Sequence, residues 1–196
     1  MITMSLILLA YLLGSVSSAV IVCKLFKLPD PRLSGSKNPG ATNVLRLAGK
    51  KFAAIVLIGD LIKGLLPVLL VASLGGSQVM RALVAGAAVL GHVFPLYYRF
   101  KGGKGVATAL GAYWGLHPLL GLLSSLTWVI VFKLFGYSSL SSIVMIILAP
   151  FYAWIWVQHV GYFFILLLIS CIILLKHKEN IKRLMAGIES KMTKHE

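Results

Sequence analysis

Residues 99–108 combine the residue types of a phosphate-binding loop. Lys104 stands among three glycines, and an apolar run resumes at Val106. Glycines let backbone N–H groups approach a ligand closely, and a helix that begins near Val106 would point its positive end at the same place. The stretch is not a Walker A loop, because it lacks the first glycine of that motif and no Ser or Thr follows the lysine. It predicts either an anion site or an ordinary cytoplasmic loop whose cations follow the positive-inside rule.

The loop at residues 24–51 offers a second group of polar side chains. Its centre, residues 34–43, combines turn-forming residues with short hydrogen-bonding side chains. Thr42 could cap a short interfacial helix, with Thr42, Asn43 and Arg46 on one face. A guanidinium beside such a polar cradle suits a phosphate. We therefore expect a substrate site here, and the alternative is a solvated loop with turn signals.

Two charged residues interrupt the second apolar segment. Asp60 and Lys63 stand three positions apart within residues 55–71, so they can pair on one face of a helix. Ionisable groups inside a membrane are functional candidates, but a dedicated partner favours a structural clamp that holds the loop bases together. His92, just before Pro95, is either a base or a structural hydrogen-bonding residue, and we favour the structural role.

Serine and aspartate patterns exclude several kinds of catalytic site. Ser141 and Ser142 begin an apolar segment, where either could cap the helix, and either could also donate to an anion. No Gly-x-Ser-x-Gly elbow points to a nucleophilic serine. The only aspartates are Asp30 and Asp60, and neither lies five residues after a histidine, so the sequence contains no His-x4-Asp catalytic motif. No His, Cys, Asp or Glu cluster has metal-ligand spacing, so we expect no metal and no cofactor.

The chain after the last apolar segment is basic and amphipathic. His177, Asn180 and Arg183 share one face at helical spacing, while Ile181 and Leu184 continue an apolar stripe. A membrane-surface helix with snorkelling cations explains the lysines. It does not explain why the histidine and the asparagine project together, so these two are also site candidates.

The composition is that of an integral membrane protein. Of 196 residues 59% are hydrophobic and only 12% are charged, and 19 Lys and Arg against 5 Asp and Glu give a formal charge of +14. The cations lie between apolar segments, so anionic lipids and phosphorylated substrates are expected as partners, and nucleic acid is not. Residues 2–23 are too long for a cleaved signal peptide. Cys23 and Cys171 lie in apolar runs and are expected to be small buried residues.

The topology depends on how residues 107–135 are divided. A break at His117 and Pro118 gives seven spans and gathers nearly all cations on one side, whereas an unbroken helix gives six and separates Lys104 from the basic tail. We therefore predict an all-α integral membrane protein with seven transmembrane helices, the N-terminus outside and the C-terminus cytoplasmic. One helix, at residues 107–116, is short or re-entrant and needs cover from its neighbours or contact with water. The other predicted spans are residues 2–23, 52–72, 80–98, 119–135, 142–158 and 160–175.

Four segments together resemble one protein family. They are residues 35–43 (GSKNPGATN), 91–95 (GHVFP), 100–108 (FKGGKGVAT) and 177–180 (HKEN). The chain is similar in these segments to the bacterial acyl-phosphate:glycerol-3-phosphate acyltransferases of the PlsY type. The resemblance covers essentially the whole chain. It implies a single transmembrane acyltransferase domain over residues 1–196, with cytoplasmic loops at 24–51, 99–106 and 136–141 and a cytoplasmic tail at 176–196.

The family pattern implies an activity in the bacterial plasma membrane. An acyl chain passes from acyl phosphate to the 1-hydroxyl of sn-glycerol 3-phosphate, which gives lysophosphatidate and inorganic phosphate at the start of phospholipid synthesis. The active site faces the cytoplasm, and an upstream enzyme that forms acyl phosphate is a possible partner. The residues implied as catalytic are Ser36, Arg46, Lys104, Ser142, His177 and Asn180, and those implied as substrate-binding are Asn38, Gly40, Thr42, Asn43, Gly102, Gly103, Gly105 and Thr108.

The residues agree with this chemistry. An acyl phosphate is already activated, so catalysis needs positioning and charge stabilisation more than a strong base. The cytoplasmic carboxylates are few and are a poor source of a general base, and the substrate's own phosphate, with a second pKa near ~6, can take the proton. Two other functions are also compatible with the sequence: a transporter or channel for phosphate-type anions, and a basic scaffold that binds anionic lipid. The nearly bare outer side favours the enzyme.

Overall fold

The computed structural model describes residues 2–192 of the chain, and within that range it is helical with no β-strand. Four of the predicted spans, residues 52–72, 107–116, 119–135 and 160–175, each lie within one helix. A 3-10 turn follows α5 and a π-helical turn follows α8. The elements are α1 (Ile2–Gly14), α2 (Ser18–Leu25), α3 (Ala41–Ala48), α4 (Lys50–Ser73), α5 (Gln78–Val93), η1 (Leu96–Tyr98), α6 (Val106–Leu116), α7 (Pro118–Phe135), α8 (Ser138–Tyr152), η2 (Ala153–Val157), α9 (Val160–Lys176) and α10 (Lys178–Met185).

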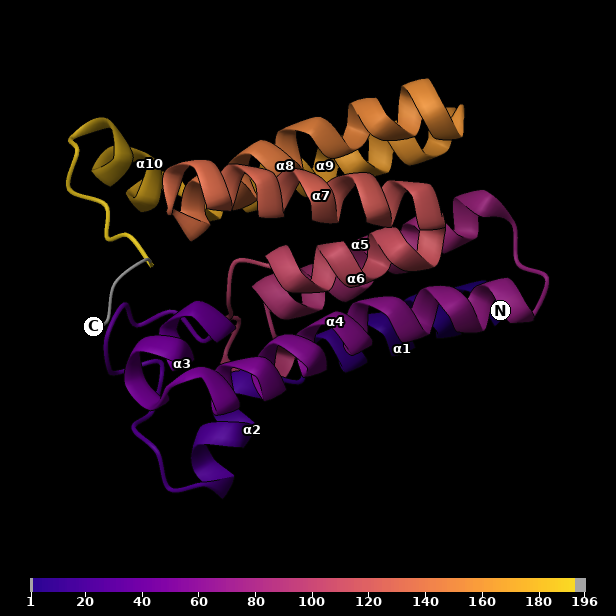
Figure 1. The fold of residues 1–196 in the computed structure, drawn as a ribbon. Helices are drawn as coiled ribbons and strands as arrows, with labels where there is room; N and C mark the ends of the chain where they lie inside the picture. Colours follow the sequence, from indigo (N-terminus) through magenta and orange to yellow (C-terminus); the bar gives the residue numbers. More distant parts are fainter. Residues whose placement is uncertain (1, 193–196) are drawn as a thin grey trace.

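The long helices lie side by side in a bundle (Figure 1). In this view α7, α8 and α9 form one group, α1 and α4 lie on the opposite side, and α5 and α6 lie between them. The short helices α2, α3 and α10 gather at one end of the bundle, and the N-terminus lies at the other. Segments that are far apart in the sequence therefore meet at a single end.

Four helices are long and apolar enough to cross a membrane, and six are when each of two bent pairs is counted as one span. The described residues thus support an integral membrane fold of four to six candidate spans. The predicted break at His117 and Pro118 is confirmed, because α6 ends just before it and α7 begins at the proline. Proline suits the first position of a helix, where no N–H bond is needed.

The apolar sequence of residues 2–23 predicted one continuous span. The structure differs, because the helix is interrupted within this segment. It breaks between α1 and α2, which meet at an angle of 42°. Ser17 caps α2, because its Oγ accepts a bond from the N–H of Val20. At the other bend, α9 and α10 meet at 62° on either side of His177.

The short helix α6 is covered by its neighbours, as its length requires. It has 11 residues and packs against α4, α5 and α7. Glycines allow the close approach to α4, since a Cβ on Gly64 would collide with the carbonyl of Thr108 and one on Gly111 with the carbonyl of Leu61. Small residues that bring backbones together are a common means of helix association in membranes.

Candidate active site

The loop before α6 is shaped by His92. The N–H of Gly103 donates to the carbonyl of His92 at 3.2 Å. A Cβ at Gly102 would collide with that carbonyl, and a Cβ at Gly103 would collide with the imidazole ring. Gly105 has φ +88°, a left-handed conformation that favours glycine, and it directly precedes the first turn of α6. The loop therefore presents the positive end of α6, as the sequence predicted.

Lys104 links this loop to the last helix. Its Nζ donates to Oδ1 of Asn180 at 2.6 Å, across 76 positions of sequence. Asn180 is buried on α10, which is one of the short helices that gather at one end of the bundle (Figure 1). Two residues implied as catalytic are thus in direct contact.

Glu189 is the partner that the sequence did not reveal. Its Oε1 accepts from Asn180 Nδ2 and from Ser139 Oγ, each at 2.7 Å, and its Oε2 accepts from Arg183 Nε at 2.6 Å. Burial would raise the pKa of Glu189, but these hydrogen bonds outweigh it and hold the pKa below its usual value. The side chain is only 6% exposed. The carboxylate fixes the amide of Asn180 so that the amide oxygen faces Lys104.

Replacing Glu189 with glutamine is expected to raise KM about tenfold and to leave kcat within about threefold, because a misplaced Asn180 and Lys104 weaken binding. Steady-state kinetics with both substrates would measure this. The matched control is Glu179→Gln, because Glu179 pairs with Lys182 on an exposed face of α10. A lost kcat with unchanged KM would instead identify Glu189 as a catalytic base.

His177 lies at the junction of α9 and α10 and is 2% exposed. Its Nδ1 lies 2.8 Å from the carbonyl of Ile173. Because a carbonyl oxygen only accepts, Nδ1 carries a proton and Nε2 is the ring atom left for another partner. The ring lies close enough to Lys104 to feel the charge of its ammonium group.

The affinity for a phosphate substrate is expected to fall as the pH rises through about 8. Burial, together with the charges of Arg183 and Arg46, lowers the pKa of Lys104 to about 8 despite the opposing charge of Glu189. Below that pH the ammonium is present to bind phosphate, and above it the charge is lost. KM measured on both sides of pH 8 checks this. An arginine at position 104 keeps its charge above pH 8, so in the Lys104→Arg variant KM should not rise with pH. If KM still rises as in the wild type, another group is responsible for the pH dependence.

Asn43 organises the loop that precedes α3. Its Oδ1 accepts from the N–H of Ser36 at 2.9 Å, and its Nδ2 donates to the carbonyls of Pro31 and Ser34 at 2.9 and 3.0 Å. Asn43 is 1% exposed. Its direct contact with substrate stays a prediction, since in this form the amide holds the loop in place.

The other candidates in this loop lie nearer its surface. Gly40, not Thr42, is the N-cap of α3, so the predicted cap was wrong by two residues. Thr42 instead brings its Oγ1 to 3.3 Å from Ser138 Oγ, which joins α3 to the start of α8. Asn38 lies beside Gly40, with its carbonyl accepting from the N–H of Gly40. Arg46 is exposed and close enough to lower the pKa of Lys104. Ser36 is exposed.

Ser142 and Thr108 lie in the packing between helices. Neither Ser141 nor Ser142 caps α8, which begins at Ser138. Ser142 Oγ donates to the carbonyl of Ser138 at 2.8 Å and accepts from Trp128 Nε1 at 3.1 Å. Thr108 is fully buried, and its hydroxyl has no hydrogen-bond partner within the described part of the chain. The structure does not bring these two hydroxyls to the contact between Lys104 and Asn180, and their roles stay predictions.

One family model covers nearly the whole chain. The model described as glycerol-3-phosphate acyltransferase matches residues 4–187, which include the glycine loop, both bends and the network around Glu189 except the glutamate itself. The chain belongs to the glycerol-3-phosphate acyltransferase family. The resemblance inferred from the four motifs is thereby confirmed.

Relatives of this acyltransferase family share about half of the sequence. A glycerol-3-phosphate acyltransferase from Legionella pneumophila (strain Philadelphia 1) is 49% identical over 187 residues, which are 95% of this chain and 68% of that protein. One from Erwinia tasmaniensis is 52% identical over 192 residues, which are 97% of this chain and 92% of that protein.

Solved structures of the family share the fold. The crystal structure of PlsY (YgiH), an integral membrane glycerol 3-phosphate acyltransferase, in its glycerol 3-phosphate form matches with a TM-score of 0.92 at 39% identity, over 97% of this chain and 95% of that one. The lysophosphatidic acid form matches with a TM-score of 0.89 at 38% identity, over 96% and 94%. The chain is thus an acyltransferase of the integral membrane class.

Proposed function

We propose that the chain transfers an acyl group from acyl phosphate to the 1-hydroxyl of sn-glycerol 3-phosphate, giving lysophosphatidate and inorganic phosphate. Family membership supports the acceptor, since the two solved relatives are described in a glycerol 3-phosphate form and a lysophosphatidic acid form. The observation that carries the proposal is the contact of Lys104 with Asn180, beside Arg183 and Arg46. This cationic group stands next to a glycine loop at the N-terminus of α6 and suits phosphate.

The reaction needs no protein nucleophile. The 1-hydroxyl oxygen attacks the acyl carbon, the bond between that carbon and the phosphate oxygen breaks, and phosphate leaves with the electron pair. We assign the hydroxyl proton to a substrate phosphate, whose second pKa is near ~6. The chain positions the two anions and stabilises the charge on the acyl oxygen and on the departing phosphate.

Our assignment of residues follows the family pattern and the geometry. We place the phosphate of acyl phosphate at Lys104 and its neighbouring glycines, because the loop offers backbone N–H groups there. The carboxylate of Glu189 supports this assignment by orienting Asn180, whose amide oxygen accepts from Lys104. The remaining residues that we assign to the two substrates are Ser36, Asn38, Gly40, Thr42, Asn43, Arg46, Thr108, Ser142, His177 and Asn180.

We also propose that a single domain of seven spans, with α6 as the short one, places this site on the cytoplasmic face of the bacterial plasma membrane, next to anionic lipid. The gathering of α2, α3 and α10 at one end supports a one-sided site. Lys101→Cys and Lys178→Cys, both at exposed positions, test this in a Cys171→Ser background. Both should react with an impermeant thiol reagent from the cytoplasmic side only. Reaction of the two from opposite sides would refute a shared site.

The activity is tested with detergent-purified protein, palmitoyl phosphate and glycerol 3-phosphate. Released phosphate and lysophosphatidate should appear in equal amounts, and omission of glycerol 3-phosphate should abolish both. Palmitoyl-CoA serves as the control donor and should give no product. Failure to form lysophosphatidate from acyl phosphate, with product from the thioester, would change the assigned donor. Glycerol 3-phosphate flux in proteoliposomes tests the transporter, which family membership does not favour.

A further inference from the structure

An ion pair lies in the middle of α4, where the sequence is otherwise apolar. Lys63 Nζ lies 2.8 Å from Asp60 Oδ1, and the side chains are 9% and 3% exposed. The predicted pairing of these residues is confirmed. A buried ion pair seldom adds net stability compared with apolar residues of the same volume. Its presence in a membrane helix therefore points to a task beyond holding the fold.

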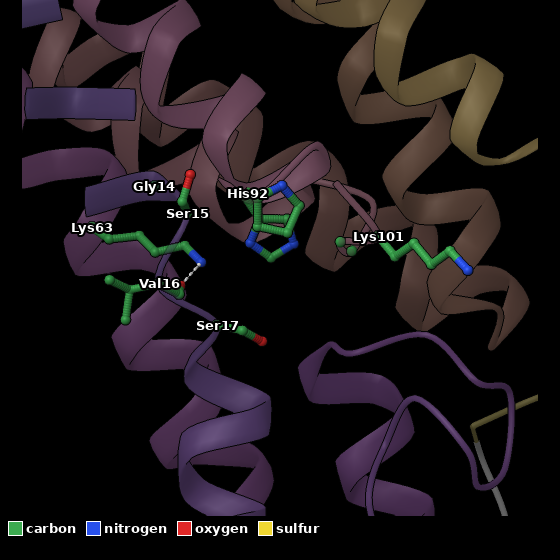
Figure 2. Close-up of a pocket in the computed structure, with 10 residues that line it drawn as sticks. Gly14, Ser15, Val16, Ser17, Lys63, His92 and Lys101 are labelled. Atoms are coloured by element: carbon green, nitrogen blue, oxygen red, sulfur yellow. Dashed lines mark hydrogen bonds between the residues drawn. The ribbon is translucent and has the colours of Figure 1, made fainter. Parts of the chain in front are cut away.

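The lysine also binds the broken first span. Lys63 Nζ donates to the carbonyl of Val16 at 2.7 Å, in the bend between α1 and α2 (Figure 2). This carbonyl lies where the helix is interrupted, so the ammonium supplies a partner that the helix cannot. Nearby, Ser15 Oγ accepts from the N–H of Leu96 at 3.3 Å, which ties the same bend to the end of α5.

The aspartate faces His92, on which the glycine loop rests. Asp60 Oδ1 lies 3.6 Å from His92 Nδ1, which has no hydrogen-bond partner among residues 2–192. This is an electrostatic contact longer than a hydrogen bond. On its other side the ring packs directly against Gly103, whose N–H is bound by the carbonyl of the same histidine.

A small cavity lies between the ion pair and the loop. Its volume is about 10 Å³, and its lining includes Lys63, His92, Gly102 and Gly103 (Figure 2). A space of this size holds at most one water molecule. A phosphate group is larger than this space, so we expect the ion pair to influence the substrate through the position of the loop.

We propose that Asp60, Lys63 and His92 are positioning residues for the acyl-phosphate site: the ion pair in α4 holds the imidazole on which Gly102 and Gly103 rest. The contacts run from Lys63 to Asp60, from Asp60 to His92, and from His92 to the glycine loop. A shift of the imidazole moves Gly103 and, with it, the adjacent Lys104. This inference rests on the proposed function, because acyl phosphate is the ligand assigned to the loop.

Two double variants separate positioning from charge balance. Asp60→Asn with Lys63→Met removes both charges and keeps an oxygen acceptor that faces His92. Asp60→Leu with Lys63→Met removes both charges and the acceptor, in a side chain of similar shape. Both should lose the same stability, because both leave the Val16 carbonyl without its donor, so their unfolding temperatures should match each other.

The readouts are KM for acyl phosphate and amide hydrogen exchange of a peptide covering residues 99–105. Asp60→Leu with Lys63→Met should raise KM about tenfold and speed exchange in this peptide, while KM for glycerol 3-phosphate stays within about twofold. The asparagine version, which keeps the acceptor, should raise KM and speed exchange less than the leucine version. Equal behaviour of the two double variants overturns the proposal, since then only charge balance matters.

The His92→Asn variant and hydrogen exchange keep the proposal testable if the leucine variant does not fold or if the wild type does not use acyl phosphate. His92→Asn keeps the backbone carbonyl that binds Gly103 but removes the ring, and it should show the same rise in KM and in exchange. If the leucine double variant does not fold, an unchanged His92→Asn variant overturns the proposal. Hydrogen exchange does not depend on turnover, so it decides the positioning role even if the wild type forms no product from acyl phosphate, a result that refutes the proposed function alone.

Discussion

Replacing Lys104 with methionine is expected to lower kcat/KM for acyl phosphate between about 100- and 1,000-fold, the loss typical of removing one donor that stabilises a developing anion. Lys104 is the cation of the glycine loop, and its ammonium is already directed at Asn180 by a 2.6 Å hydrogen bond. Methionine keeps most of the side-chain volume and removes the charge. Phosphate release from palmitoyl phosphate, measured against both substrates, gives the effect.

The control for this prediction is Lys101→Met in the same loop. Lys101 is exposed, and within residues 2–192 its side chain makes no hydrogen bond or ion pair with the Glu189 network, so kcat/KM should stay within about threefold of the wild type. A comparable loss in both variants would mean that the loop contributes only a general positive potential. Near-wild-type turnover of Lys104→Met would remove the lysine from the site.

Replacing Gly103 with alanine is expected to reduce kcat/KM at least about 100-fold, as a displacement of about 1 Å can do. The added Cβ would collide with the imidazole of His92, which is itself 8% exposed and packed against α4. The loop has to move, because the ring is the less mobile partner. The same steady-state assay measures the loss, and circular dichroism confirms that the helices are retained.

Gly86→Ala is the matched control for this substitution. Gly86 lies on α5, the helix that also carries His92, and a Cβ there would meet Ile165 at an ordinary 3.7 Å. The variant should keep its activity and its melting temperature. If Gly103→Ala is equally active, the glycine loop is not the rigid element that we describe.

Local patterns predicted much of the fold. Apolar runs located the long helices, and the proline at position 118 located the break between α6 and α7, because both signals reside in neighbouring residues. The bend between α1 and α2 could not be predicted in this way. Ser15 and Ser17 are compatible with a membrane helix, and the bend depends on Lys63, which lies far along the chain.

In the candidate site, too, the features set by neighbouring residues could be predicted and those set by distant residues could not. The glycine loop and the face of His177 and Asn180 were visible as motifs, since each is contiguous or at helical spacing. Glu189 was not, because its donors lie six to fifty positions away and its role exists only after the chain turns back beyond Gly187. A left-handed glycine after an amphipathic helix was the one signal of that reversal. Ser142 fits a cap by sequence, but α8 starts one turn earlier.

The order of the chain gives the network around Glu189 a consequence for biosynthesis. Asn180 and Glu189 follow every long apolar helix of the bundle, while Lys104 and Ser139 precede the last ones. During translation the apolar helices can therefore enter the bilayer before the polar groups that meet at their end are complete. Insertion of the bundle and assembly of the network are then separate events, and a nascent chain that stalls at Lys176 carries α1 to α9 without Asn180 and Glu189.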